Sequence, residues 1–219
     1  MRPIFVTGTG TDVGKTHILC AMLEAHRRAG GRARIMKPII SGFDPAQLNA
    51  TDTIRLMRAN GDELTGEGVQ AVSPWRFKAP LSPDMAAFKE GRELMIDSVT
   101  RWCLDRIDRA MPTVIEGAGG VMSPLATDGL NLDLIRELDA RPILVAGAYL
   151  GTISHTLTAL RVMDARCTVI VNDFNARPVS AVDTARSIQR FAPRADVRVF
   201  SGDADGLVDL LAPVEAAAG

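Results

Sequence analysis

The sequence predicts a single α/β domain of three layers, in which a mainly parallel sheet is flanked by helices on both faces. Short β-branched runs alternate with longer amphipathic segments along the chain. A glycine-rich turn that ends in Gly14-Lys15-Thr16 follows the first of these runs. The 219 residues are 47% hydrophobic, which suits one buried core and leaves too little chain for two large domains.

The elements expected in this domain follow from two different hydrophobic periods. Short apolar runs bounded by glycine, proline or asparagine predict strands at residues 4–7, 33–39, 113–116, 143–146 and 168–172. Apolar residues three and four apart predict helices at residues 15–29, 51–60, 93–110, 152–164 and 180–191. We expect the domain to cover residues 1–219, with a frayed tail at 212–219. Because functional loops lie at the carboxyl ends of parallel strands, the chemistry is expected there.

Composition limits the kinds of binding partner and the cellular location that we expect for this protein. The formal net charge is -1, and basic and acidic residues are interspersed, which argues against a nucleic acid partner. No apolar segment has the length of a membrane span, and the first residues lack the pattern of a signal peptide. We therefore expect no membrane partner and a cytoplasmic location. The three cysteines show no pairing or zinc-binding spacing, so we interpret them as core or helix-face residues.

The loop "GTGTDVGKT", residues 8–16, has the ending of a phosphate-binding loop. Its glycine lies one residue earlier than the usual spacing requires, because Thr9 occupies the expected position. Such a turn directs backbone N–H groups at phosphate oxygens, and the following helix adds a favourable dipole. Lys15 would contact the outer phosphates and Thr16 would ligate Mg²⁺. The sequence therefore predicts a P-loop NTPase-like fold.

Three charged residues are candidates for the same site. Lys37 follows a buried run and precedes a proline, so its charge should project from a strand end beside the first loop, although a surface lysine would show the same spacing. Glu116 ends an apolar strand, where P-loop proteins hold Mg²⁺. Asp52 is ambiguous by itself, since the helix dipole favours an acid in the first turn with or without a metal.

Five segments, in this order and spacing, together resemble dethiobiotin synthetase. They are "GTGTDVGKT", "KPIISG", "PWRFKAPLSP", "EGAGG" and "GAYLGTISHTLTA", and the resemblance extends over residues 2–175. It implies a homodimer with the active site at the interface. It also implies an ATP- and Mg²⁺-dependent ring closure of 7,8-diaminopelargonate with CO₂, through a carbamate and a carbamic-phosphoric mixed anhydride. The products are dethiobiotin, ADP and phosphate.

The resemblance assigns site residues to four groups. The catalytic group is Lys15, Lys37 and Thr11, and the metal group is Thr16, Asp52 and Glu116. The nucleotide group is Gly8, Asp12, Val13, Gly14, Lys15, Thr16, His17 and Asn172, with Asn172 at the base. The substrate group is Lys37, Ser41, Thr11, Gly119, Leu81, Gly151, Thr152 and Ile153, the last three reaching across the dimer.

The sequence also departs from the family pattern. Gly10 and Ser154 stand where aspartate and asparagine are usual, and Asp84 where histidine is frequent. The segment after Val199 has no equivalent of the loop that packs on the purine.

Two other functions fit part of the pattern. A switch ATPase of the partitioning or nitrogenase-reductase type shares the loop and the sheet, but it usually carries a further lysine early in the loop, and none precedes Gly14 here. An amide-forming synthetase of the cobyrinate diamide kind would need a glutaminase domain, for which this chain has no room.

Overall fold

The computed structural model describes residues 1–108, 110–163, 167–173 and 179–212. Residues 213–219 of the expected tail and residue 164, the last of an expected helix, lie outside these ranges. Among the described residues, no helix is long and apolar enough to cross a membrane.

A six-stranded sheet forms the centre of the structure, with the order β10-β9-β8-β1-β5-β2. Every pair of neighbours in it is parallel. The strands are β1 (Ile4–Gly8), β2 (Arg34–Met36), β5 (Thr113–Glu116), β8 (Arg141–Gly147), β9 (Thr168–Asn172) and β10 (Asp196–Phe200). The central position of β1, between β5 and β8, places its loop at the middle of the carboxyl edge.

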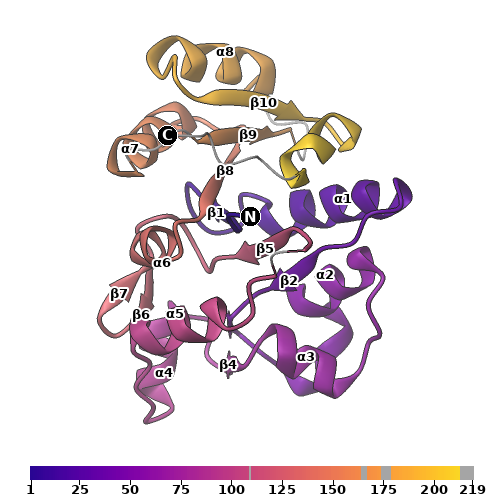
Figure 1. Cartoon of the computed structure of the whole chain (residues 1–219). Coiled ribbons are helices and arrows are strands. Elements are labelled where there is room, and N and C mark those ends of the chain that lie inside the picture. Colours follow the sequence, from indigo (N-terminus) through magenta and orange to yellow (C-terminus); the bar gives the residue numbers. More distant parts are fainter. Residues whose placement is uncertain (109, 164–166, 174–178, 213–219) are drawn as a thin grey trace.

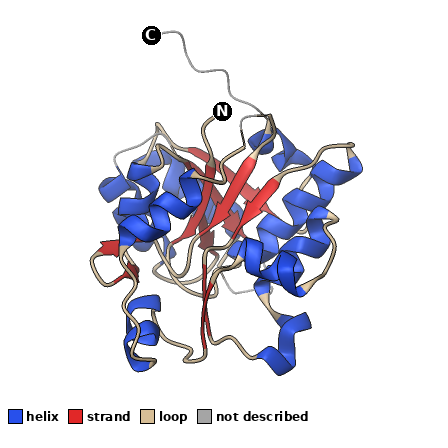
Figure 2. Cartoon of the chain, turned by 60° about the horizontal axis from the view of Figure 1, so that its bottom comes forward, coloured by secondary structure: helices blue, strands red, loops and turns tan. Residues whose placement is uncertain are grey.

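Helices cover both faces of this sheet, as Figures 1 and 2 show. One face carries α1 (Lys15–Arg28), α2 (Asp52–Asn60), α3 (Gly66–Val72) and the 3₁₀ helix η2 (Asp205–Leu211). The other carries α5 (Ile96–Leu104), α6 (Asn131–Glu137), α7 (Thr152–Met163) and α8 (Ala181–Phe191). The predicted three-layer α/β architecture is therefore confirmed.

Side-chain alternation along the strands divides the core into two clusters. In β1, Ile4 and Val6 pack with α1 and α2, whereas Phe5 packs on the opposite face. All three side chains are buried, which explains why the strand is a continuous apolar run instead of an alternating one.

The remaining elements lie around the carboxyl end of the sheet. They are the pair β3 (Ile39–Ser41) and β4 (Trp75–Phe77), the pair β6 (Pro124–Ala126) and β7 (Gly129–Leu130), α4 (Pro83–Lys89) and the 3₁₀ helix η1 (Pro45–Ala50). Figure 1 shows β4, β6, β7 and α4 together on the lower side of the molecule. These short elements, together with α3, α6, η2 and β10, were not expected from the sequence.

Two expected elements need correction. The strand expected at 33–39 is broken, because Lys37 donates its backbone N–H to Val72 O and Pro38 has no N–H to give to a ladder. The helix expected at 93–110 begins only at Ile96, whose N–H is taken by the Asp128 carboxylate, and it ends at Leu104. The helix starts expected at residues 51 and 180 are N-caps, with side-chain oxygens that accept backbone N–H bonds.

The cysteines are free, as expected. Cys103 and Cys167 are buried and Cys20 is partly buried on α1. Burial raises the pKa of each thiol to about 12.

Helix α8 provides a test of how much of the stability depends on the core cluster between the sheet and helices α5, α6, α7 and α8. Ile188 is fully buried, so Ile188→Ala should lower the free energy of unfolding by about 2–5 kcal/mol. Val182, on the same helix, is 47% exposed, and Val182→Ala should change it by less than about 0.5 kcal/mol. Denaturant titration checks both values. Equal effects of the two substitutions would contradict the packing described here.

Candidate functional site

The loop at residues 8–16 is held in its shape by its neighbours. Gly14 has φ of 97°, a left-handed conformation that favours glycine, and a Cβ there would lie 2.1 Å from Asn172 Nδ2. Asn172 ends β9, and its Nδ2 donates to Val13 O at 3.0 Å. A residue distant in sequence therefore fixes the loop just before Lys15.

The glycine-rich loop after β5 packs directly on the first loop. Val121 N donates to Gly8 O at 3.0 Å, and a Cβ on Gly120 would lie 3.2 Å from the same oxygen. A Cβ on Gly8 would in turn lie 2.8 Å from Val13 Cγ2. The two loops approach one another closely because these positions carry no side chain.

Four charged side chains and one hydroxyl meet where these loops leave the sheet. Lys37 Nζ is 2.5 Å from Glu116 Oε1 and 3.2 Å from Asp52 Oδ2. Thr16 Oγ1 donates to the same Glu116 Oε1 at 2.7 Å. Lys15 Nζ donates to Gly10 O at 3.2 Å. Two cations thus face two carboxylates in a largely buried cluster.

Burial and the neighbouring opposite charges shift the pKa values of these groups in opposite directions. Burial lowers the pKa of Lys15, and the negative charge of Glu116 offsets only part of that effect. Burial also disfavours charge on Lys37, but Glu116 and Asp52 outweigh it and leave the pKa of Lys37 raised. For Asp52, burial is outweighed chiefly by Lys37, and the pKa is lowered. The Lys37 ammonium and the Asp52 carboxylate are therefore both charged at neutral pH.

The backbone of Lys37 is fixed by groups that sequence reasoning missed. Its N–H donates to Val72 O at 3.1 Å, and its carbonyl accepts from Ser73 Oγ at 2.7 Å. Ser73 Oγ also lies 2.6 Å from Thr53 Oγ1. No local signal in the sequence marks this chain of bonds, because its members come from three different elements.

Asn131 is a second missed residue. It is fully buried at the start of α6, and its Nδ2 lies 2.6 Å from Ala118 O, 2.9 Å from Gly120 O and 3.4 Å from Ser123 O. Three carbonyls of the loop after β5 are thus gathered on one amide group. A polar residue at a helix start is a weak signal, since N-terminal positions favour asparagine without any such role.

The cluster of Thr16, Asp52 and Glu116 has the oxygen ligands of a Mg²⁺ site. Thr16 supplies a hydroxyl, Asp52 and Glu116 supply carboxylates, and Glu116 Oε2 is buried without a hydrogen-bond partner in the structure. In the described ranges, no group of three or more histidine, cysteine, aspartate or glutamate residues could hold a metal alone. This small oxygen set fits Mg²⁺, which usually keeps water and takes phosphate oxygens as its other ligands.

A cavity of about 720 Å³ opens over this cluster. The predicted site residues that line it are Thr11, Asp12, Gly14, Lys15, Thr16, His17, Lys37, Ser41, Asp52, Leu81, Glu116 and Gly119. Arg55, which was not predicted, also lines it, and its Nη1 is 3.7 Å from Asp52 Oδ1. Most of the predicted site is thus assembled from segments far apart in sequence.

The other predicted residues lie outside the lining of this cavity. Gly8 and Val13 belong to the first loop and lie close to each other. Asn172 supports this loop through its hydrogen bond to Val13 O. Gly151, Thr152 and Ile153 lie where β8 leads into α7. Thr152 Oγ1 is buried there without a partner in the structure, while Leu150 beside it is 93% exposed. The structure therefore does not bring this segment to the cavity of the same chain.

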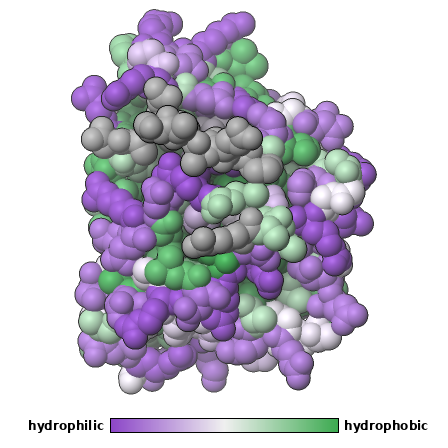
Figure 3. Space-filling model, viewed as in Figure 1, coloured by the Kyte–Doolittle hydropathy of each residue, from purple (hydrophilic) through white to green (hydrophobic). Residues whose placement is uncertain are grey.

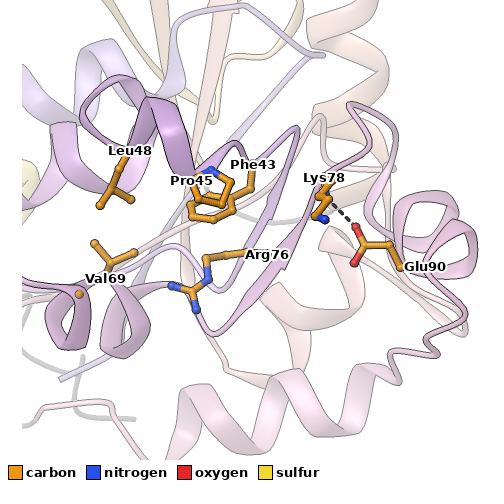
Figure 4. A pocket seen from close by; sticks show the side chains of 8 residues that line it. Phe43, Pro45, Leu48, Val69, Arg76, Lys78 and Glu90 are labelled. Carbon is orange, nitrogen blue, oxygen red and sulfur yellow. Dashed lines mark hydrogen bonds between the residues drawn. The ribbon is translucent and has the colours of Figure 1, made fainter.

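A second hollow lies beside β4 and α3, with a volume of about 360 Å³. Figure 4 shows Arg76 beneath Phe43, and Lys78 joined to Glu90. The Arg76 guanidinium lies 5.3 Å from the centre of the Phe43 ring and bonds to Gln70, and Lys78 N donates to Glu90 Oε1 at 2.6 Å. None of the eight residues lining it was predicted to belong to the site, and Arg76 and Glu90 already have partners.

The chain is similar to characterised families over most of its length. A family model described as an AAA domain matches residues 2–205. The ATP-dependent dethiobiotin synthetase BioD of Caulobacter vibrioides (strain NA1000 / CB15N) is 44% identical over 220 residues, with 96% of this chain and 99% of the relative covered. The enzyme of that name from Acidiphilium cryptum (strain JF-5) is 38% identical over 209 residues, with 93% and 94% covered.

Solved structures show a more distant similarity. The signal recognition particle receptor FtsY from Elizabethkingia anophelis matches with a TM-score of 0.44 and 15% identity, over 91% of this chain. The chain spans 57% of the length of that receptor. Chloroplast FtsY from Physcomitrella patens matches with a TM-score of 0.47 and 15% identity, over 97% of this chain and 66% of that one.

The bonds made by Asn131 can be tested by exchanging its donor for an acceptor. Asn131→Asp keeps the shape but turns a carboxylate toward three carbonyls, so it should destabilise the protein more than Asn131→Ala. The alanine variant should lose about 1–3 kcal/mol, because buried carbonyls are left without donors. Denaturant unfolding measures both. Wild-type stability in the aspartate variant would show that Asn131 does not hold the loop.

Proposed function

Since the chain belongs to the ATP-dependent dethiobiotin synthetase family, we propose that it catalyses ATP-dependent dethiobiotin synthesis in the biotin pathway. The observation that carries the proposal is the meeting of Lys15 and Thr16 with Lys37 and Glu116 over one cavity. The phosphate-binding loop and the second lysine, Lys37, can therefore act on the same reacting group of a substrate in this cavity. The proposal includes the cytoplasmic location expected from the sequence.

The proposed reaction joins 7,8-diaminopelargonate and CO₂ at the expense of ATP. One amine of the diamine adds to CO₂ and loses a proton, which gives a carbamate. A carbamate oxygen attacks the γ-phosphorus, the bond to ADP breaks, and a carbamic-phosphoric mixed anhydride forms. The second amine then attacks the carbonyl carbon, phosphate leaves, and the ureido ring closes.

The residues of the cavity suit the charge that develops during these steps. The proposal assigns Lys15 to the outer phosphates and Lys37 to the carbamate and the transferred group. Thr11 and Ser41 also line this cavity, and the proposal assigns their hydroxyls to the substrate. Since the carbamate is itself the nucleophile, positioning and charge stabilisation are the main tasks, and no nucleophilic side chain is needed.

Nucleotide and metal would share the first loop. The proposal assigns the phosphates to the backbone of the loop and its flanking residues, Gly8, Asp12, Val13, Gly14, Lys15, Thr16 and His17. Asn172 is assigned to the base, and its Oδ1, which is buried without a partner in the structure, leaves one acceptor available. Thr16, Asp52 and Glu116 would hold Mg²⁺, which neutralises charge on the phosphate oxygens when bound.

The proposed substrate site also uses Gly119, Leu81 and a neighbouring subunit. In a homodimer, Gly151, Thr152 and Ile153 would hold the carboxylate of the diamine with backbone amides at the start of α7. The 93% exposure of Leu150, just before this segment, supports a role for it outside its own chain.

A switch ATPase acting on a protein partner is the alternative. It would hydrolyse ATP in response to that partner, whereas the proposed synthetase should couple hydrolysis to the diamine and bicarbonate. The loop residues before Gly14 include no lysine, which favours the synthetase.

The decisive measurement is incubation with ATP, Mg²⁺, bicarbonate and 7,8-diaminopelargonate, followed by mass analysis of the product. We expect dethiobiotin, with ADP release that depends on the diamine. Lys15→Ala should lower turnover by roughly 10²-fold or more, because it removes a cation that stabilises developing charge. ADP release unaffected by omission of the diamine would refute the proposal.

Subunit mixing tests the shared active site. Lys15→Ala disables the phosphate half of a site, and Gly151→Trp, at a residue with φ of 97°, should disable the carboxylate half. A mixture of the two inactive proteins should regain part of the activity, because one hybrid site then has both halves intact. Absence of recovery after subunit exchange has been demonstrated would place both halves within one chain.

A further inference from the structure

Lys37 occupies the place between the two carboxylates of the proposed metal site. Its Nζ is 2.5 Å from Glu116 Oε1 and 3.2 Å from Asp52 Oδ2. The side chains of Lys37 and Glu116 are 7% and 1% exposed, so water contributes little to their pairing. In this state the ammonium group is the cation that balances a buried carboxylate.

A divalent ion cannot join this arrangement without disturbing it. Thr16 Oγ1 and Lys37 Nζ both contact Glu116 Oε1, at 2.7 Å and 2.5 Å, while Glu116 Oε2 has no hydrogen-bond partner in the structure. Mg²⁺ binds oxygens at about 2.0–2.1 Å, so an ion that joins Thr16 to either oxygen of Glu116 lies close to the Lys37 ammonium. Two cations on one buried carboxylate repel strongly, because the surroundings screen them poorly.

We propose that Lys37 and the divalent metal are alternative occupants of this acidic site, and that metal arriving with the nucleotide releases the Lys37 ammonium into the cavity. The inference rests on the proposed metal site and adds a coupling to it. Once released, Lys37 can meet the anionic oxygen of the substrate. Before release, that oxygen lacks its cation, so reactive contact waits for the metal.

The local geometry permits this exchange. The backbone of Lys37 is fixed by Val72 O and Ser73 Oγ, so only the side chain has to move. Lysine has a flexible four-carbon stem, and the cavity of about 720 Å³ that it lines offers room for another orientation. The metal would replace the ammonium at Glu116 and Asp52, and the carboxylates would stay neutralised. Asp52 also faces Arg55 at 3.7 Å, which can remain in place.

Lys15 is the matched control. It lies in the same cavity, but its Nζ is hydrogen-bonded to the Gly10 carbonyl instead of a carboxylate. Removal of either lysine deletes one positive charge from the site. Only the removal of Lys37 should vacate the position between the acids.

Binding of Mn²⁺ alone to the nucleotide-free protein, measured by electron paramagnetic resonance, tests the exchange. Lys37→Met should bind Mn²⁺ at least about 10-fold more tightly than the wild type, whereas Lys15→Met should gain no more than about threefold. Equal gains in the two variants, or no gain in Lys37→Met, would overturn the proposal.

The wild-type protein gives a second test that does not depend on the folding of a variant. The chain has only four lysines, so ¹⁵N-lysine labelling yields few ammonium signals, and Lys37→Arg assigns the one of interest. We expect the Lys37 signal to change when Mg²⁺ is added with a non-hydrolysable ATP analogue, but not with the analogue and a chelator. The exposed Lys78 and Lys89 serve as internal references. A Lys37 signal that stays unchanged when metal binds would overturn the exchange.

Failure of the metal site itself gives a different result. If wild type with the ATP analogue binds Mn²⁺ no better than Asp52→Asn with the analogue, the proposed metal site is wrong and the exchange falls with it. If the wild type binds Mn²⁺ and Asp52→Asn does not, the proposed metal site is supported. The experiments on Lys37 and Lys15 then decide by themselves whether Lys37 and the metal exchange.

Discussion

The buried carboxylate of Glu116 is the constraint on which the arrangement of this site depends. A charge that is 1% exposed is costly unless a partner balances it, and in this structure the partner is Lys37 at 2.5 Å. Thr16 adds a hydroxyl bond to the same oxygen. The first loop, the end of β2 and the end of β5 are therefore tied together by one carboxylate. These three segments are held together at the sheet edge by this ion pair as well as by the order of the strands.

The parallel sheet provides the geometry that this ion pair requires. In the register of β1 and β5, Val6 lies opposite Glu116, so the carboxylate leaves the sheet beside the start of the first loop. Strand β2 pairs with β5 on its other side and delivers Lys37 at the same edge. A break at Pro38 follows at once, which lets the lysine turn toward Glu116 instead of continuing in the ladder.

Two asparagines show how a glycine-rich site obtains rigidity. Glycines allow the loops to approach one another, but they also increase the conformational entropy that must be lost on folding. Asn172 fixes the first loop through Val13 O, and Asn131 gathers three carbonyls of the loop after β5. Asn172 lies 159 residues from Val13, whereas Asn131 follows the carbonyls that it contacts by 8 to 13 residues. The loops are therefore shaped by neighbouring elements as well as by their own residues.

The sequence by itself determined the fold class, the loop around Lys15 and the charged candidates Lys37 and Glu116, whereas Asp52 was ambiguous until the family resemblance singled it out. Hydrophobic period and glycine spacing are local properties, and a charge at the end of an apolar run can be recognised from a few residues. Only the tertiary structure decided that Lys37 pairs with both acids, that Asn131 and Ser73 support the site, and that residues 33–39 are divided into two strands. Glu116 and Ser73 lie 79 and 36 residues from Lys37, and Asn131 lies 8 to 13 residues from the carbonyls that it contacts. The hydrogen bonds and ion pairs of a buried polar group are settled by which elements pack together, and no local pattern records that choice.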